Sequence, residues 1–169
     1  MQSIVITIMG KDKPGLVDAV AKCVYQHQGN WQGSSFARMA GMFTGFVEIH
    51  VPENSHQALV RALDSIPDLT VQSVTVAHTP SSYQETLAVE VMGNDKPGIV
   101  QELTNILNQF NLNIESFDSR CESAPNWGSL MFKARAVIGV PEDFDSQSLQ
   151  SALESISNDL VVDIGSSCQ

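Results

Sequence analysis

The sequence contains nearly the same eight residues twice, GKDKPGLV at 10–17 and GNDKPGIV at 93–100. Each copy follows a segment of alternating apolar residues and precedes a segment whose apolar residues have helical spacing. Each copy therefore predicts a turn from a strand into a helix. Two copies in register within a chain of 169 residues indicate an internal repeat. The repeat decides the fold, because both halves must then form the same structure.

The shared DKPG tetrapeptide suits the start of a helix. Proline costs little in a first helical turn, because its missing N–H would have no partner there. Asp12 and Asp95 are predicted to cap free backbone N–H groups. Gly15 and Gly98 remove a side chain where each helix begins, so another backbone or a ligand can approach. The turn predicts either a purely structural helix start or a site for a small carboxylate.

The remaining elements also occur twice. In the first half we expect a strand in SIVITIM at 3–9, a helix with its apolar stripe on Val17, Val20 and Val24, strands at 31–39 and 44–51, a helix from His56 and a strand from Thr70. In the second half we expect a helix with its stripe on Val100, Leu103, Leu107 and Phe110, strands at 114–122 and 129–140, a helix from Ser146 and a strand from Leu160.

This order predicts an α+β protein of two ferredoxin-like βαββαβ units, each a four-stranded antiparallel sheet with two helices on one face. We expect the first domain at 1–78, a polar linker at 79–84 and the second domain at 85–169. The sheet face without helices carries alternating apolar residues and needs a partner. Either the two units satisfy each other or the chain forms a homodimer.

Charge and composition exclude several classes of protein. The net charge is −10, with 5 basic and 6 acidic residues up to Gln84 and 4 basic and 13 acidic residues after it. Without a basic cluster, direct binding to nucleic acid is not expected. The acidic second half predicts either a solvated surface or a face for a basic partner. No signal peptide or membrane span is expected, and three unpaired cysteines indicate a cytoplasmic protein.

The titratable residues form no predicted catalytic or metal centre, so we expect neither an enzyme nor a cofactor. The four histidines lack the spacing of metal ligands and are interpreted as surface or interface residues: His27, His50, His56 and His78. Cys23 is expected to be half-buried. Arg120 beside Cys121 predicts a somewhat lowered thiol pKa, which would permit oxidation sensing.

Two tryptophans are candidates for packing or contact. Trp127, in the loop Glu122–Gly128, is predicted either to anchor an interface or to fold back on its own hairpin. Trp31, at the start of a strand, is expected in the core or in inter-domain packing.

The element order with DKPG at its first turn resembles the ACT domain, a module that binds amino acids in many metabolic regulators. The resemblance covers both halves of the chain. A free-standing pair of such domains is most similar to the glycine cleavage system transcriptional repressor family. In ligand-binding ACT domains, the first loop and an asparagine at the second strand hold the amino acid between neighbouring domains. The resemblance places these positions at Gly10, Asp12, Pro14, Gly15 and Asn30, and at Gly93, Asp95, Pro97, Gly98 and Asn113.

One departure from the family pattern affects the chemistry of the loop. Some ACT domains have an amide where this chain has Asp12 and Asp95. A carboxylate there would attract the ammonium group of an amino acid and repel its carboxylate.

The resemblance implies a repressor without chemistry of its own, which holds an activator of glycine cleavage genes and responds to an amino acid, with glycine suspected. The alternative is an amino-acid sensor that regulates a metabolic enzyme in trans. The sequence leaves open which amino acid binds and whether both sites function.

Overall fold

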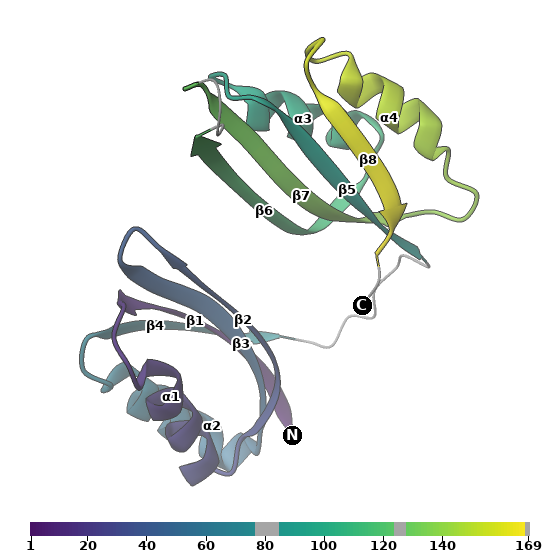
Figure 1. Cartoon of the computed structure of the whole chain (residues 1–169). Coiled ribbons are helices and arrows are strands. Elements are labelled where there is room, and N and C mark those ends of the chain that lie inside the picture. The colour runs from purple at the N-terminus through teal and green to yellow at the C-terminus, as the bar shows by residue number, and fades with distance from the viewer. Residues whose placement is uncertain (77–84, 124–127, 168–169) are drawn as a thin grey trace. The chain divides into compact units, whose positions relative to one another are not determined.

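Each half of the chain folds as strand, helix, strand, strand, helix, strand, as the repeat predicts (Figure 1). The computed structural model describes residues 1–76, 85–123 and 128–167. The chain divides into two compact units, Met1–Pro80 and Ser81–Gln169. The linker predicted at 79–84 lies outside the described residues.

The first unit contains β1 (Gln2–Lys11), α1 (Leu16–Gln26), β2 (Asn30–Met39), β3 (Met42–Val51), α2 (Glu53–Asp64) and β4 (Leu69–Val76). Its strands pair in the order β2-β3-β1-β4, and every pair is antiparallel. Both helices cover the same face of the sheet (Figure 1). Within residues 1–76, no helix covers the opposite face.

The second unit contains β5 (Glu85–Asn94), α3 (Ile99–Gln109), β6 (Asn113–Ser123), β7 (Leu130–Val140), α4 (Ser146–Glu154) and β8 (Val161–Ser166). Its strand order, β6-β7-β5-β8, repeats that of the first unit. A register shift interrupts β2 between Trp31 and Gly33, and the same shift interrupts β6 between Ile114 and Ser116. The ferredoxin-like α+β fold is thus confirmed in both units, and the two units also share this irregularity.

Each unit has its own hydrophobic core between the sheet and the helices. In β1 the side chains of Ile4, Ile6 and Ile8 are fully buried, as the strand alternation predicts. Trp31 packs against this core, as expected. The cores consist of apolar side chains, and the described residues include no buried polar or charged residue.

The buried helix stripes include the predicted Val20, Val24, Leu103 and Leu107, but the first residue of each stripe lies one position before the predicted one. Val17 is 38% exposed and Val100 is 40% exposed, whereas the preceding Leu16 and Ile99 are buried. The stripe of α1 consists of Leu16, Val20, Cys23 and Val24. Both choices are compatible with helical spacing, because residues three or four positions apart share a face. Packing against the sheet buries the residue immediately after the glycine, Leu16 or Ile99, instead of the next one.

Candidate functional site

The two DKPG turns connect an inner strand of each sheet to the first helix of each unit. In the first unit, the backbone N–H of Asp12 donates to the carbonyl of Gly41, at 3.0 Å. In the second, the N–H of Asp95 donates to the carbonyl of Leu130, at 2.9 Å. Each turn is therefore tied to the beginning of β3 or β7, which fixes its position at one end of the sheet.

The glycine at the end of the first strand has a structural role in both copies. A Cβ on Gly10 would lie 2.5 Å from the backbone oxygen of Asp68. A Cβ on Gly93 would lie 2.9 Å from a methyl carbon of Leu160. Both contacts are too close for a side chain, and in the first unit the neighbour is backbone. Gly10 and Gly93 thus allow the chain to enter the last strand beside the turn.

The aspartates do not cap the helices, contrary to the prediction. The N-cap residues are Gly15 and Gly98, in the left-handed conformation with φ of 91° and 85°, and neither helix has a side-chain cap. Pro14 and Pro97 lie before the cap, in the turn, instead of within the first helical turn. The prediction was wrong because each helix begins after the glycine, too far along the chain from the aspartate.

The carboxylate of the first turn forms an ion pair with an arginine. Asp12 Oδ2 lies 2.7 Å from Arg38 Nε. Arg38 lies on β2, opposite Phe43 of β3, and Phe43 in turn lies opposite Gly10 of β1. Beside it, Lys13 Nζ lies 2.6 Å from Asp68 Oδ2, and this hydrogen bond with the lysine charge lowers the pKa of Asp68.

The second turn has a cysteine where the first has an arginine. Cys121 is level with Phe132 and Gly93, so it is the counterpart of Arg38. Partial desolvation and the neighbouring Asp95 carboxylate raise the pKa of Cys121. Among the described residues, no lysine or arginine forms an ion pair with Asp95. The two turns share a backbone but differ in charge.

The predicted effect of Arg120 on Cys121 was also wrong. Neighbouring residues in a strand point to opposite faces of a sheet. Arg120 therefore pairs with Glu122, at 2.7 Å, on the face away from the helices. Cys121 faces Asp95 instead, and its pKa is raised instead of lowered.

The asparagines lie at the other end of each sheet. Asn30 is level with His50 and Ser3, seven residues along β1 from Gly10. At ~3.3 Å per residue this separation is about 23 Å. Asn113 is level with Gly139 and Thr86 in the same way. The structure brings the loop residues together within each unit but does not bring the asparagine of that unit to them.

The other titratable residues assemble no centre in the described part of the chain. No group of three His, Cys, Asp or Glu residues there could hold a metal ion. His27 Nδ1 lies 2.8 Å from the carbonyl oxygen of Cys23, and His50 Nε2 lies 3.5 Å from Glu48 Oε1. Cys23 is buried instead of half-buried, because it belongs to the core stripe of α1, and burial raises its pKa.

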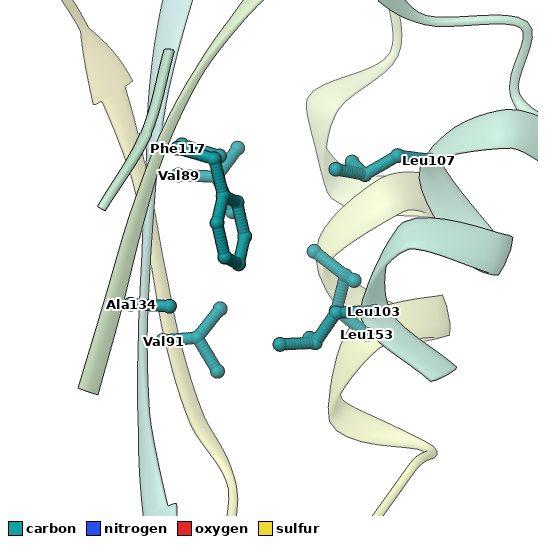
Figure 2. A pocket seen from close by; sticks show the side chains of 8 residues that line it. Val89, Val91, Leu103, Leu107, Phe117, Ala134 and Leu153 are labelled. Carbon is teal, nitrogen blue, oxygen red and sulfur yellow. The ribbon is translucent and has the colours of Figure 1, made fainter. Parts of the chain in front are cut away.

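An apolar cavity of about 10 Å³ lies in the core of the second unit. Figure 2 shows side chains from the sheet and from the helices facing each other across it. Its lining is Val89, Val91, Leu103, Leu107, Phe117, Ala134, Ala136 and Leu153. This volume is about that of one water-sized sphere, and the lining offers no polar partner. The cavity is a packing gap and cannot hold an amino acid.

Two residues singled out in the sequence, His78 and Trp127, lie outside the described residues, and so does the third cysteine, Cys168. In the part of the chain that is described, no helix combines the length and apolar character needed to cross a membrane.

Comparisons with known proteins agree with this architecture. Residues 2–73 and 85–166 each match the ACT domain family. The glycine cleavage system transcriptional repressor of Escherichia coli strain K12 is 22% identical over 161 residues, which cover 93% of this chain and 85% of the relative.

Two crystal structures share the fold of the whole chain. An unknown protein from Galdieria sulphuraria has a TM-score of 0.86, with 22% identity over 99% of both chains. A candidate glycine cleavage system transcriptional repressor has a TM-score of 0.70, with 20% identity over 98% of both chains.

Proposed function

The chain belongs to the ACT domain family, and from this premise we propose that it is an amino-acid-responsive repressor that acts by protein contact and has no catalytic activity. Family membership and similarity to a transcriptional repressor support a regulatory, amino-acid-sensing role. The observation that carries the proposal is the extent of that similarity, which spans both units and 93% of the chain. Such a regulator would work in the cytoplasm, the compartment that the cysteine usage predicts.

The charges of the two turns favour the second as the ligand site. An amino acid brings an ammonium group, which needs a carboxylate that is not already neutralised. Asp12 is engaged by Arg38 at 2.7 Å, whereas no described cation pairs with Asp95. The ligand carboxylate would bind backbone N–H groups at the start of α3, which Gly98 leaves open. We therefore assign the ammonium site to Asp95.

The asparagine of the family pattern would come from a second copy of the chain. Asn113 is at the opposite end of the sheet from Asp95, so it cannot contact the same small ligand. Binding that requires two copies would respond to their arrangement, and a ligand shifts an equilibrium towards the arrangement that it binds more tightly.

The second unit also has the charge expected of a surface for a basic protein. All four of its cations are in ion pairs within the unit: Lys96, Arg120, Lys133 and Arg135. Most of the 13 acidic residues after Gln84 therefore remain without a cation partner. A DNA-binding activator has a basic surface, and opposite charge would accelerate its encounter with this unit. We propose that the activator binds here, and that glycine releases it.

The ligand site is tested by thermal melts of the whole chain with glycine and the other common amino acids. A ligand at about ten times its Kd adds roughly 1.4 kcal/mol, which raises the melting temperature by a few degrees. We expect the shift with glycine to disappear in Asp95→Asn, because an amide cannot pair with the ammonium group. The matched variant Asp12→Asn should keep the shift.

Two outcomes would contradict the assignment. A shift that survives in Asp95→Asn and disappears in Asp12→Asn would move the site to the first unit. No shift with any amino acid would remove ligand sensing from the proposal.

Co-purification with a metabolic enzyme instead of a DNA-binding protein would favour the alternative, a sensor that regulates an enzyme in trans.

A further inference from the structure

The sheet of the first unit has an exposed face with the composition of an interface. This face, which we call the outer face, consists of the residues that alternate with buried Ile4, Ile6 and Ile8 and of their neighbours across the strands. Its large apolar members include Val5, Met9, Met39, Met42, Phe46 and Val74. Phe46 is 55% exposed, Val74 is 63% exposed and Met39 is 68% exposed. Enrichment in methionine and aromatic residues is typical of interface centres.

The outer face is also poor in charge, although the chain has a net charge of −10. Its formally charged residues are Lys11 and Glu48. Glu48 already accepts a hydrogen bond from Ser3 Oγ, at 3.1 Å, and lies 3.5 Å from His50 Nε2. Covering this face would therefore dehydrate two charged groups, Lys11 and a Glu48 carboxylate that has partners within the unit.

The equivalent face of the second unit has a different chemistry. Its register positions hold ion pairs, with Lys133 2.9 Å from Glu122 and Arg135 3.2 Å from Glu90. Asp118 and Asp163 lie on the same face. The fold is the same, so the low charge of the first face is a property of its sequence and not of the fold.

We propose that the outer face of the first unit binds the same face of a second copy of the chain, in a symmetric dimer. In a symmetric dimer the same face of each copy meets itself. Two strongly acidic faces would repel each other, whereas two copies of this nearly neutral face do not. The inner strands and β2 have 10 residues each. Four strands ~4.8 Å apart and about 33 Å long present about 600 Å² per copy. The total of about 1,200 Å² is at the lower end for a specific interface.

An interface of this size predicts a dimer that dissociates in the micromolar range. Sedimentation velocity of the whole chain, from low micromolar to several hundred micromolar concentration, measures the association. Phe46→Lys places a charge on inner strand β3 of the outer face and Val74→Lys places one on edge strand β4, and each should weaken the dimer about tenfold or more. Val161→Lys is the matched control: Val161 is 60% exposed, lies in the last strand of the second unit and should leave the dimer unchanged.

Circular dichroism of each variant checks that it folds, since all three side chains are exposed. A wild-type chain that stays monomeric at the highest concentration would overturn the proposal. So would a dimer that Val161→Lys weakens while Phe46→Lys and Val74→Lys do not, because the contact would then lie on the second unit. A monomer whose Phe46→Lys variant loses a different protein partner would assign the face to that partner.

Discussion

Single substitutions between the repeats change the charge beside each turn. Arg38 and Cys121 occupy equivalent positions beside the two aspartates, so one carboxylate is neutralised and the other faces a thiol whose pKa is raised. The glycines at the strand ends are unchanged, because the chain passes too close to them for a side chain. The glycines and the two aspartates are thus repeated, whereas the residue beside each aspartate has diverged.

The structural role of Gly10 predicts a large loss of stability for Gly10→Ala. The new Cβ would lie 2.5 Å from the Asp68 backbone oxygen, so the backbone must shift. We expect a cost of about 2 kcal/mol or more. Gly33→Ala is the control, because nothing lies within 4 Å of the added atom, and it should change stability by less than about 0.5 kcal/mol. Hydrogen exchange of first-unit peptides in the whole chain measures both, and equal protection in the two variants would contradict the prediction.

At the scale of elements, the second helix of each unit begins differently. In the first unit the N-cap of α2 is Pro52, without a side-chain cap. In the second, the Asp145 carboxylate accepts hydrogen bonds from the N–H groups of Gln147, at 3.1 Å, and Ser148, at 3.2 Å. The hydroxyl of Ser148 donates to the same carboxylate, and together these bonds lower the pKa of Asp145. The second copy of this helix start therefore has a titratable cap, whereas the cap residue of the first copy is a proline.

This lowered pKa predicts a stability contribution that depends on pH. Since the folded state favours the ionised form, the contribution is complete above the ordinary aspartate pKa and is lost as the pH falls through the lower folded-state value. Asn at an N-cap accepts the same N–H bonds without titrating. At neutral pH the melting temperature should therefore be highest for wild type, lower for Asp145→Asn and lowest for Asp145→Ala. At acidic pH the advantage of wild type over Asp145→Asn should vanish, and a constant difference would be the contrary result.

At the scale of the whole molecule, two units with one fold differ in charge and in the exposed faces of their sheets. The residues up to Gln84 carry 5 basic and 6 acidic side chains, and the residues after it carry 4 and 13. Each unit has a core of its own, so the fold does not require the surfaces to match. The two proposals accordingly assign an apolar contact to the first surface and a basic partner to the second.

The uneven charge predicts that salt stabilises the second unit more than the first. Unpaired carboxylates repel one another, and added salt screens this repulsion. Hydrogen exchange of the whole chain at low and high sodium chloride should show protection that increases more in 85–123 and 128–167 than in 1–76. Equal gains in both units would show that repulsion among these carboxylates does not limit stability.

The sequence by itself determined the repeat, the order of the elements and the residues of the two turns. These features depend on local patterns: alternation in strands, helical spacing in helices and glycine or proline at turns. The same patterns left the helix stripes uncertain by one residue, since Leu16 and Val17 both have helical spacing with Val20 and Val24. They also placed the start of the helix before Gly15, which is why a capping role for Asp12 was predicted.

Only the tertiary structure decided what lies beside each turn. Arg38 reaches Asp12, and Cys121 reaches Asp95, through the register of strands that are distant in the sequence and contain an irregularity. The same register places Asn30 at the far end of the sheet from the turn. A shift of one residue in a strand exchanges the faces of all its side chains, and local patterns do not encode the pairing between distant strands. The hydrogen-bonded sheet therefore determines the chemistry of the site, whereas the sequence pattern determines its backbone.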